Sequence, residues 1–340
     1  MVNPSHISLV ANDRSYLAGI KKEVHKLAVQ AGFEQKKINE VDIIISELGT
    51  NLVKHANGGE ILAGIVKDDR GTFLEVISID NGPGISDPER MLQDGVSTTR
   101  TLGQGLGAIK RLSNDFDIYS KKGWGTIILS RVYDEKGKDK SIRRSPLTVR
   151  SLVVTKPGEL TSGDGWYGFV ARDGTFRLLA GDGLGHGYEA GLAVSEAIAA
   201  FREIETNSPM DILRQLHTAI KKTRGMVSAV VIVDSVQKTW KFCGIGNIAT
   251  RFIGVHHARS YLSFNGIVGH NIPTTLYDQT LPHNDYHQII LCSDGIRSRW
   301  EHARLPDINK QDLIVQAAAI YKDFARKTDD MSIIIGKLQS

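Results

Sequence analysis

Residues 181–187 read Gly-Asp-Gly-Leu-Gly-His-Gly, which places one acid among four glycines. This stretch follows an apolar run, Phe176 to Ala180, which predicts a strand, and it precedes a helix predicted over residues 188–204. Glycine allows a close backbone approach or a positive φ, so the stretch predicts a loop at which Asp182 meets a ligand. A Walker-type phosphate loop needs a Lys and a Ser or Thr after its glycines. This sequence has His186 and a glycine there, which excludes that interpretation.

Further acids stand beside the apolar runs of residues 148–340. A hard divalent cation needs several carboxylate and carbonyl oxygens brought together from different strands. The sequence offers such acids at the ends of predicted strands, namely Asp164, Asp294 and the pair Asp329 and Asp330. Asp-Gly is also a common turn dipeptide, so each acid taken alone is compatible with a simple turn. The ordered set favours one metal cluster that includes Asp182.

These motifs recur in a known order along residues 148–340. They are Gly-Asp at 163–164, the stretch 181–187, Gly-Asn at 246–247, Ser-Asp-Gly at 293–295 and Asp-Asp-Met-Ser at 329–332. The set resembles the metal-dependent protein phosphatases of the SpoIIE type, and its Gly-Leu-Gly-His-Gly variant is similar to the RsbX-like branch. The resemblance implies an αββα sandwich that binds two Mn²⁺ or Mg²⁺ ions, between which a bridging water would attack phosphorus in line. The implied metal ligands are Asp164, Asp182, the Gly183 carbonyl, Asp294 and Asp329, the last favoured over Asp330 because it matches the family position.

Two features of this phosphatase-like region stay open. His186 is either a general acid or simply a residue of the loop before the helix. The arginine with which eukaryotic relatives grip phosphate has no match upstream of Asp164, and Arg150 is too distant to assign. A metal-less pseudophosphatase is disfavoured because all four acids are present.

Composition places the chain among ordinary two-domain globular proteins. It has 340 residues, of which 41% are apolar and 24% charged. The net charge of +4 is too small to indicate nucleic acid. The sequence has no run of 18 apolar residues, so no membrane span is expected. Residues 1–6 do not show a charged region followed by an apolar core, so no signal peptide is expected. Cys243 and Cys292 lie in apolar runs, so buried free thiols and a cytoplasmic location are expected.

The N-terminal part predicts a strand and two helices. Residues 6–10 form the expected strand, and Asn12 or Asp13 would cap a helix that ends near Gly32. A second helix has apolar residues every three or four positions from Ile38 to Leu52. Glu47, Asn51 and His55 are spaced four apart on a neighbouring face, which is also the pattern of a solvated surface.

Two glycine-containing stretches follow that helix. The predicted strand Phe73 to Ile79 ends in Asp-Asn-Gly-Pro-Gly at 80–84, and Gly-Gln-Gly-Leu-Gly at 103–107 precedes a helix predicted over 108–112. Glycines at a helix start expose backbone amides to an anion, so residues 103–107 predict a phosphate site. A dinucleotide fold would instead need its glycines on the first strand and an acid about twenty residues later.

The order Glu-x-x-x-Asn, Asp-x-Gly-x-Gly, Gly-x-Gly-x-Gly and then Gly125-Thr126 resembles the GHKL superfamily of ATPases and kinases over residues 5–133. Ser97 to Thr99 and residues 103–107 are similar to RsbT-like switch kinases. The resemblance implies an α/β sandwich with helices on one face of a mixed sheet, with ATP and Mg²⁺ as ligands. Glu47 would be the general base and Asn51 the Mg²⁺ ligand. The nucleotide would be bound by Asp80, Gly82, Gly84, Gly103, Gly105, Gly107 and Thr126. Arg100 would either reach the γ-phosphate or be a solvated loop residue.

Three segments are therefore expected: an ATP-binding domain over 1–133, a charged linker over 134–147 and a phosphatase-like domain over 148–340. Taken together, the resemblances imply a bifunctional switch enzyme that phosphorylates a STAS-type partner and removes the phosphate. They also allow a sigma factor or a downstream phosphatase as partner, and a homodimer through the first domain. The alternative is that the first domain only binds nucleotide and regulates or targets the phosphatase.

Overall fold

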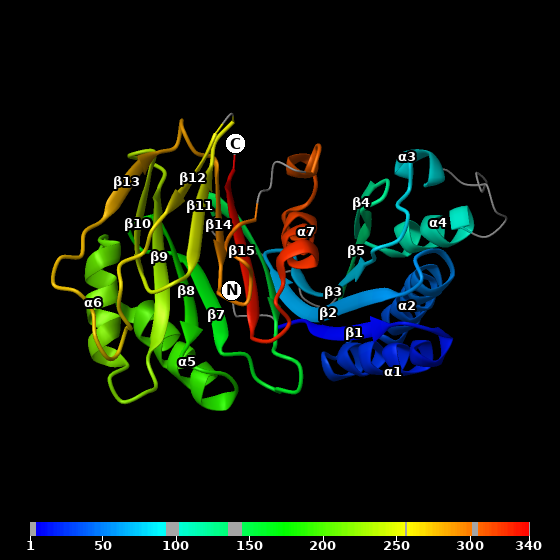
Figure 1. Cartoon of the computed structure of the whole chain (residues 1–340), viewed down its shortest axis with the longest axis horizontal. Coiled ribbons are helices and arrows are strands. Elements are labelled where there is room, and N and C mark those ends of the chain that lie inside the picture. Colours follow the sequence, from blue (N-terminus) through cyan, green and yellow to red (C-terminus); the bar gives the residue numbers. More distant parts are fainter. Residues whose placement is uncertain (1–4, 93–101, 135–144, 256, 301–304, 340) are drawn as a thin grey trace. The chain divides into compact units, whose positions relative to one another are not determined.

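The computed structural model describes residues 5–92, 102–134, 145–255, 257–300 and 305–339 (Figure 1). The described residues form two compact units. The first unit comprises the described parts of 6–142 and 302–322, and the second comprises those of 143–301 and 323–340 together with Ser5. The segment 305–322 thus joins the first unit, although it lies in the C-terminal half of the sequence. Most of the predicted linker, residues 135–144, lies outside the described residues.

The first unit contains one five-stranded sheet with the order β1-β2-β3-β5-β4. Its strands are β1 Ile7–Ala11, β2 Gly59–Asp68, β3 Gly71–Ile79, β4 Asp115–Lys121 and β5 Gly125–Tyr133. All four pairings are antiparallel, so the predicted mixed sheet is wrong in this respect. The helical crossover after β3 does produce a strand parallel to it, β4, but the hairpin partner β5 inserts between the two.

Helices cover one face of this sheet. They are α1 Arg14–Gln30, α2 Gln35–His55 and α4 Leu102–Leu112, with the short α3 Pro88–Met91 before α4 (Figure 1). The predicted cap of α1 is confirmed, since the Asp13 carboxylate accepts a hydrogen bond from the Ser15 amide at 2.7 Å. The apolar stripe of α2 is buried against Ile61, Leu74 and Val76 of the sheet.

Side chains on the opposite face of the same sheet are also buried. Strand residues alternate between faces, so Glu75 and Arg131 point away from the helices and are 1% and 2% exposed. Segment 305–322 contacts this face through hydrogen bonds to Glu60, Tyr119 and Arg131. The segment holds the 3-10 helix η2 Ile308–Lys310 and most of α7 Leu313–Phe324, whose residues from Leu313 to Tyr321 are all buried.

The second unit contains two five-stranded antiparallel sheets. The first has the order β13-β10-β9-β8-β7 and the second β12-β11-β14-β15-β6. The strands are β6 Leu147–Val154, β7 Asp164–Val170, β8 Phe176–Gly183, β9 Met226–Asp234, β10 Thr239–Ile245, β11 Ala249–Ile253, β12 Ala258–Tyr261, β13 Gln279–Pro282, β14 Gln288–Cys292 and β15 Met331–Leu338. Strands β9 and β10 are consecutive in sequence and pair antiparallel.

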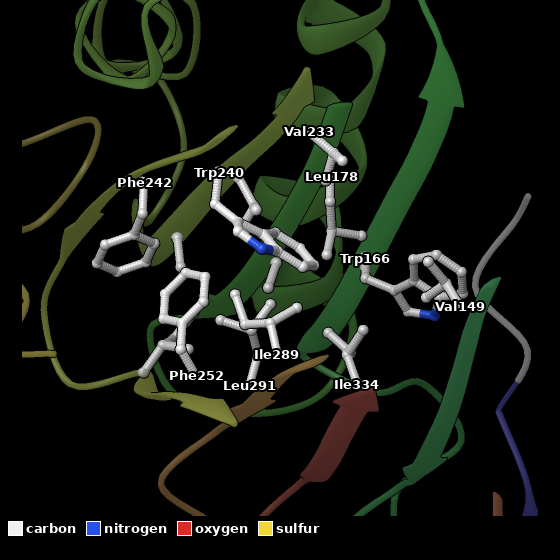
Figure 2. Close-up of a cluster of buried hydrophobic side chains, with 14 of the residues drawn as sticks. Val149, Trp166, Leu178, Val233, Trp240, Phe242, Phe252, Ile289, Leu291 and Ile334 are labelled. Carbon is white, nitrogen blue, oxygen red and sulfur yellow. The ribbon is translucent and has the colours of Figure 1, made fainter. Parts of the chain in front are cut away.

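One apolar core joins these two sheets. Figure 2 shows Trp240 and Leu178 from one sheet beside Phe252, Ile289 and Leu291 from the other. The Trp240 ring meets Phe252 edge to face, and its indole N–H donates to the Tyr286 carbonyl oxygen at 2.9 Å. This dry core fixes the strand ends at which the predicted acids stand.

Helices α5 Tyr188–Glu203 and α6 Pro209–Ala219 cover the outer face of the β7–β10 sheet, where Phe201, Ile212 and Leu216 are buried. Both cysteines are buried and unpaired, as predicted. Within the described residues, no helix is both long and apolar enough to cross a membrane.

Candidate metal and nucleotide sites

The structure brings the predicted metal-binding acids together at one end of the two sheets of the second unit. Asp164 and Asp182 are cross-strand partners at adjoining ends of β7 and β8. Asp294 follows β14, and Asp329 precedes β15, which is the neighbour of β14. The charges of all these acids act on Asp182.

This crowding raises the pKa of two acids. Burial raises the pKa of Asp182 most, and the charges of Asp164, Asp294, Asp329 and Asp330 raise it further. Burial also raises the pKa of Asp164, although the Ser293 hydroxyl donates to it at 2.6 Å. In the described part of the chain, no three acidic, His or Cys side chains are yet arranged to hold one ion in common. The residues fit a divalent cation in chemistry, since a cluster of hard oxygen ligands with raised pKa values calls for a counter-charge.

The two acids of the Asp-Asp pair differ in their bonding. Asp330 is 4% exposed, and its two carboxylate oxygens accept hydrogen bonds from the amides of Lys156 and Gly163, each at 2.7 Å. Asp329 is partly exposed, and among the described residues its carboxylate accepts a hydrogen bond from the neighbouring Asp330 amide alone, at 2.9 Å. Asp330 therefore ties the loop around Asp164 in place, and Asp329 is the acid with capacity left for a metal.

Several supporting contacts around these acids were not predicted. Ser293 donates to Asp164, and its oxygen accepts from the Ser332 amide at 2.9 Å. The side-chain amide of Asn247 donates to Asp294 at 2.9 Å, which gives the Gly-Asn turn a positioning role. At Gly183, an added Cβ would lie 2.2 Å from the Ala190 carbonyl oxygen, so a larger residue there would push α5 away. The sequence showed the Gly-Asn and Ser-Asp motifs, but only the fold shows what they bond to.

Basic side chains flank the 181–187 loop. His186 Nδ1 lies 2.6 Å from the Glu159 carboxylate, which orients the ring. Arg224, in the turn between α6 and β9, is exposed, and its guanidinium would lie 3.3 Å from a Cβ added at Gly185. The Leu184 amide donates to the carbonyl oxygen of the residue after Arg224 at 3.1 Å, which fixes this turn against the loop. No local motif in the sequence marks Arg224 as a neighbour of this loop.

In the first unit, the structure brings the α2 polar face to the glycine stretch of α4. A Cβ added at Gly105 would lie 2.6 Å from Glu47 Oε2 and 3.8 Å from Asn51 Oδ1. The side-chain nitrogen of Asn51 is buried and has no hydrogen-bond partner among the described residues. An orphaned amide beside a carboxylate and a glycine backbone is a cradle suited to a polar ligand such as a magnesium–phosphate group.

The other end of this candidate site is the turn after β3. Asp80 Oδ1 accepts hydrogen bonds from the amides of Gly82 at 2.7 Å and Thr126 at 3.1 Å. Burial raises the pKa of Asp80, and these two bonds act against that rise. At Gly84, φ is +75° and an added Cβ would lie 2.2 Å from the Lys121 carbonyl oxygen, so this turn requires glycine.

The helix after the glycine stretch begins earlier than predicted. We predicted residues 108–112, whereas α4 begins at Leu102 and contains Gly103, Gly105 and Gly107. Glycine has low helix propensity, which misled the prediction, but the packing of Leu106 and Ile109 in the core holds the turns. The first amides of α4 have no carbonyl partner within the helix. The motif Ser97 to Thr99 and Arg100 lie outside the described residues.

Comparison with known proteins finds a different family model in each half of the chain. Residues 10–131 match the family model of the histidine kinase-like ATPase domain, and residues 172–339 match that of stage II sporulation protein E (SpoIIE). The chain is 37% identical to the serine/threonine-protein kinase RsbT of Bacillus subtilis (strain 168) over 102 residues, which are 30% of this chain and 77% of that protein.

Two solved structures are also similar. One, described as “The bacterial stressosome: a modular system that has been adapted to control secondary messenger signaling”, is 27% identical with a TM-score of 0.51, and the match covers 56% of this chain and 99% of that one. The other is RsbX in complex with magnesium, which is 18% identical with a TM-score of 0.50 over 58% of this chain and 98% of that one, a likeness of fold alone. The chain therefore belongs, through its N-terminal domain, to the RsbT-like members of the histidine kinase-like ATPase family, and it carries a C-terminal phosphatase domain of the SpoIIE family.

Proposed function

We propose that this protein is a bifunctional partner-switching enzyme. Its first domain would transfer phosphate from ATP to a Ser or Thr of a partner protein, and its second domain would hydrolyse that phosphoester. The observation that carries the proposal is the approach of Gly105 to Glu47 Oε2, because a phosphate-binding backbone beside a carboxylate is what a transferase needs and a mere binding module does not.

Each residue of the first site has a role in this proposal. Glu47 takes the proton from the substrate hydroxyl, and Asn51 ligates Mg²⁺. Asp80 accepts a hydrogen bond from the adenine amino group, with Oδ1 already fixed by the Gly82 and Thr126 amides. The glycines at 103, 105 and 107 offer backbone amides to the phosphates. Phosphoryl transfer asks mainly for such positioning and charge neutralisation.

In the second site, Asp164, Asp182, Asp294 and Asp329, with the Gly183 carbonyl, are the proposed ligands of two Mn²⁺ or Mg²⁺ ions. When bound, the ions supply Lewis acidity and an activated water. The protein contributes orientation: Ser293 holds Asp164, Asn247 holds Asp294, and Asp330 holds the preceding loops. Arg224 would grip the substrate phosphate from outside the metal loop.

The partner is proposed from the relatives. The similarity to RsbT, a serine/threonine-protein kinase, and to the structure described as the bacterial stressosome supports a STAS-domain phosphoprotein as substrate. The second candidate function is a nucleotide-gated binding module without transferase activity that regulates or targets an active phosphatase. This second candidate would be favoured if Glu47 were only a residue of a solvated helix surface and not a base.

Transfer of ³²P from γ-labelled ATP to co-encoded STAS proteins tests the proposal. The enzyme is the Asp182→Asn variant, so that label is not removed, and Glu47→Gln is added in a second variant. Glu23→Gln, which changes an exposed acid of α1, is the matched control.

Label that depends on Glu47, persists with Glu23→Gln and is removed by the unmutated protein with Mn²⁺ would support both activities. Measurable ATP binding without any label would favour the binding module. Label that survives Glu47→Gln would show that the base assignment is wrong.

A further inference from the structure

Segment 305–322 is anchored to the first unit by an ion pair between buried Arg131 and partly exposed Asp312. Arg131 donates two hydrogen bonds to the two carboxylate oxygens of Asp312, at 2.7 and 2.9 Å, and a third to buried Glu75 at 2.6 Å. The Asp312 amide in turn donates to Asp117 at 2.7 Å. Because removing one partner of a buried ion pair leaves an uncompensated charge, the start of α7 is held firmly to the sheet.

The far end of α7 reaches the candidate adenine turn. Lys322 Nζ donates a hydrogen bond to the side-chain oxygen of Asn81, the residue after Asp80. The same ammonium lies 4.3 Å from the centre of the Trp124 ring, a cation–π contact. The positive charge of Lys322 also acts on Asp80, against the rise in pKa that burial causes there.

Lys322 therefore touches the two turns that frame the candidate adenine site. Trp124 belongs to the β4–β5 turn, and Asn81 belongs to the turn after β3. These turns are bonded to each other, since the Gly123 amide donates to the Pro83 carbonyl oxygen at 2.9 Å. A ligand bound against these turns would lie next to the residues that hold Lys322.

Immediately after Lys322 the chain enters the phosphatase unit, because the unit boundary falls between Lys322 and the next residue. There the Arg326 amide donates to the Gly295 carbonyl oxygen at 2.8 Å, and the Arg297 amide donates to the Phe324 carbonyl oxygen at 2.9 Å. Gly295 follows Asp294, and Asp329 comes three residues after Arg326. The end of α7 is thus bonded next to one proposed metal ligand and continues directly into another.

We propose that Lys322 is a positioning residue of the nucleotide site and that α7 transmits nucleotide occupancy to the phosphatase site, so that ATP binding strengthens metal binding there. This inference rests on the proposed function, in which Asp80 binds adenine and Asp294 and Asp329 bind metal. Ordering of the adenine turns fixes Lys322, which fixes the end of α7 and the backbone that carries both acids. Linkage makes the coupling reciprocal, so metal in the second site strengthens nucleotide binding by the same factor.

The full-length protein tests this with two readouts, a non-hydrolysable ATP analogue serving as the probe. Hydrogen exchange of peptides over 313–326 reports order in α7, and hydrolysis of p-nitrophenyl phosphate at subsaturating Mn²⁺ reports metal occupancy. Binding of the analogue is measured separately by fluorescence titration. The variants are Lys322→Met and Asn81→Ala, which break the same contact from its two sides. Lys310→Met, on the exposed part of the same segment, is the matched control.

We expect the analogue to slow exchange over 313–326 and to raise the rate about 5-fold or more in the unmutated protein and in Lys310→Met. Both responses should be lost in Lys322→Met and Asn81→Ala at analogue concentrations that the separate titration shows to be saturating for each variant. Binding without either response in the unmutated protein would overturn the coupling and leave the proposed activities standing. Normal responses in both variants would overturn the role of Lys322. No binding at all would refute the nucleotide part of the proposed function, and the coupling with it.

Discussion

Asp164 and Asp182 lie directly opposite each other on the antiparallel strands β7 and β8. Like charges at opposed positions destabilise such a pair, and Asp164 is only 2% exposed. Burial is the main cause that raises the pKa of both acids, and the charge of Asp164 adds to the rise at Asp182. In the proposed function, a divalent cation balances the charge of this pair.

The first prediction concerns metal and pH. An acid whose folded-state pKa lies above its unfolded value of about 4 makes the folded protein less stable as pH rises from the unfolded-state pKa to the folded-state pKa. The metal-free second unit should therefore lose stability as pH rises from 5 to 8, and Mn²⁺ should raise its Tm more at pH 8 than at pH 6. Calorimetry with and without EDTA measures both effects. Equal Mn²⁺ shifts at the two pH values, or an unchanged pH dependence in Asp164→Asn, would contradict the assignment.

The second prediction separates the two acids of the Asp-Asp pair. Asp329→Asn should weaken Mn²⁺ binding with little change in metal-free stability. Asp330→Asn loses an acceptor for a buried amide of Lys156 or Gly163, so metal-free stability should fall by about 1–3 kcal/mol. Its Mn²⁺ affinity should fall by about 10–100-fold, as for other residues that orient ligands. Urea unfolding in EDTA and calorimetric Mn²⁺ titration distinguish the two, and the reverse pattern would assign the ligand to Asp330.

The third prediction concerns Gly105. Gly105→Ala should displace the Glu47 carboxylate, because the added methyl would stand 2.6 Å from Oε2. Phosphate transfer should fall by about 10²-fold or more, the usual value of a positioned base. Gly19→Ala is the control, since a Cβ on α1 at that position meets nothing within 4 Å. Full transfer activity in Gly105→Ala would show that Glu47 does not act at this place.

The fourth prediction concerns Arg224. Arg224→Ala should raise KM for a phosphorylated substrate about 10-fold or more with a smaller change in kcat, because a hydrogen bond to a charged group is worth about 1.5–3 kcal/mol. Steady-state kinetics with Lys222→Ala, an exposed neighbour in the same turn, provides the comparison. If both variants change KM equally, the effect comes from the loss of a positive charge in this turn and not from a hydrogen bond between Arg224 and the phosphate.

The fifth prediction concerns Arg131. Arg131→Met should destabilise the first unit by about 3–5 kcal/mol, because it leaves Glu75 buried with only His6 as a partner among the described residues. Asp312→Asn keeps a hydrogen-bond acceptor at a less buried position and should cost less. Denaturant unfolding monitored by the Trp124 signal measures both. A loss below about 1 kcal/mol in Arg131→Met would mean that the ion pair contributes little.

Local pattern was enough to predict most elements. The spacing of apolar residues located α1 and α2, and apolar runs located β3 and β8, because one buried face imposes its period on the sequence. Patterns failed where long-range pairing decides. Whether β4 or β5 lies next to β3 depends on strand insertion, so the antiparallel sheet could not be read from the order of elements. The start of α4 was missed because core packing outweighs the low helix propensity of glycine.

The sequence by itself determined the two families and the acids and glycines proposed for their sites, since these motifs are short and each lies within one strand end, helix or loop. It could not determine that Ser293 and Asn247 orient the acids or that Arg224 lies beside Gly185. Nor could it place segment 305–322 on the first sheet, because Asp312 lies 181 residues from its partner Arg131 in the sequence. Only the tertiary structure decided these contacts, because each depends on packing that brings residues far apart in the chain within hydrogen-bonding distance.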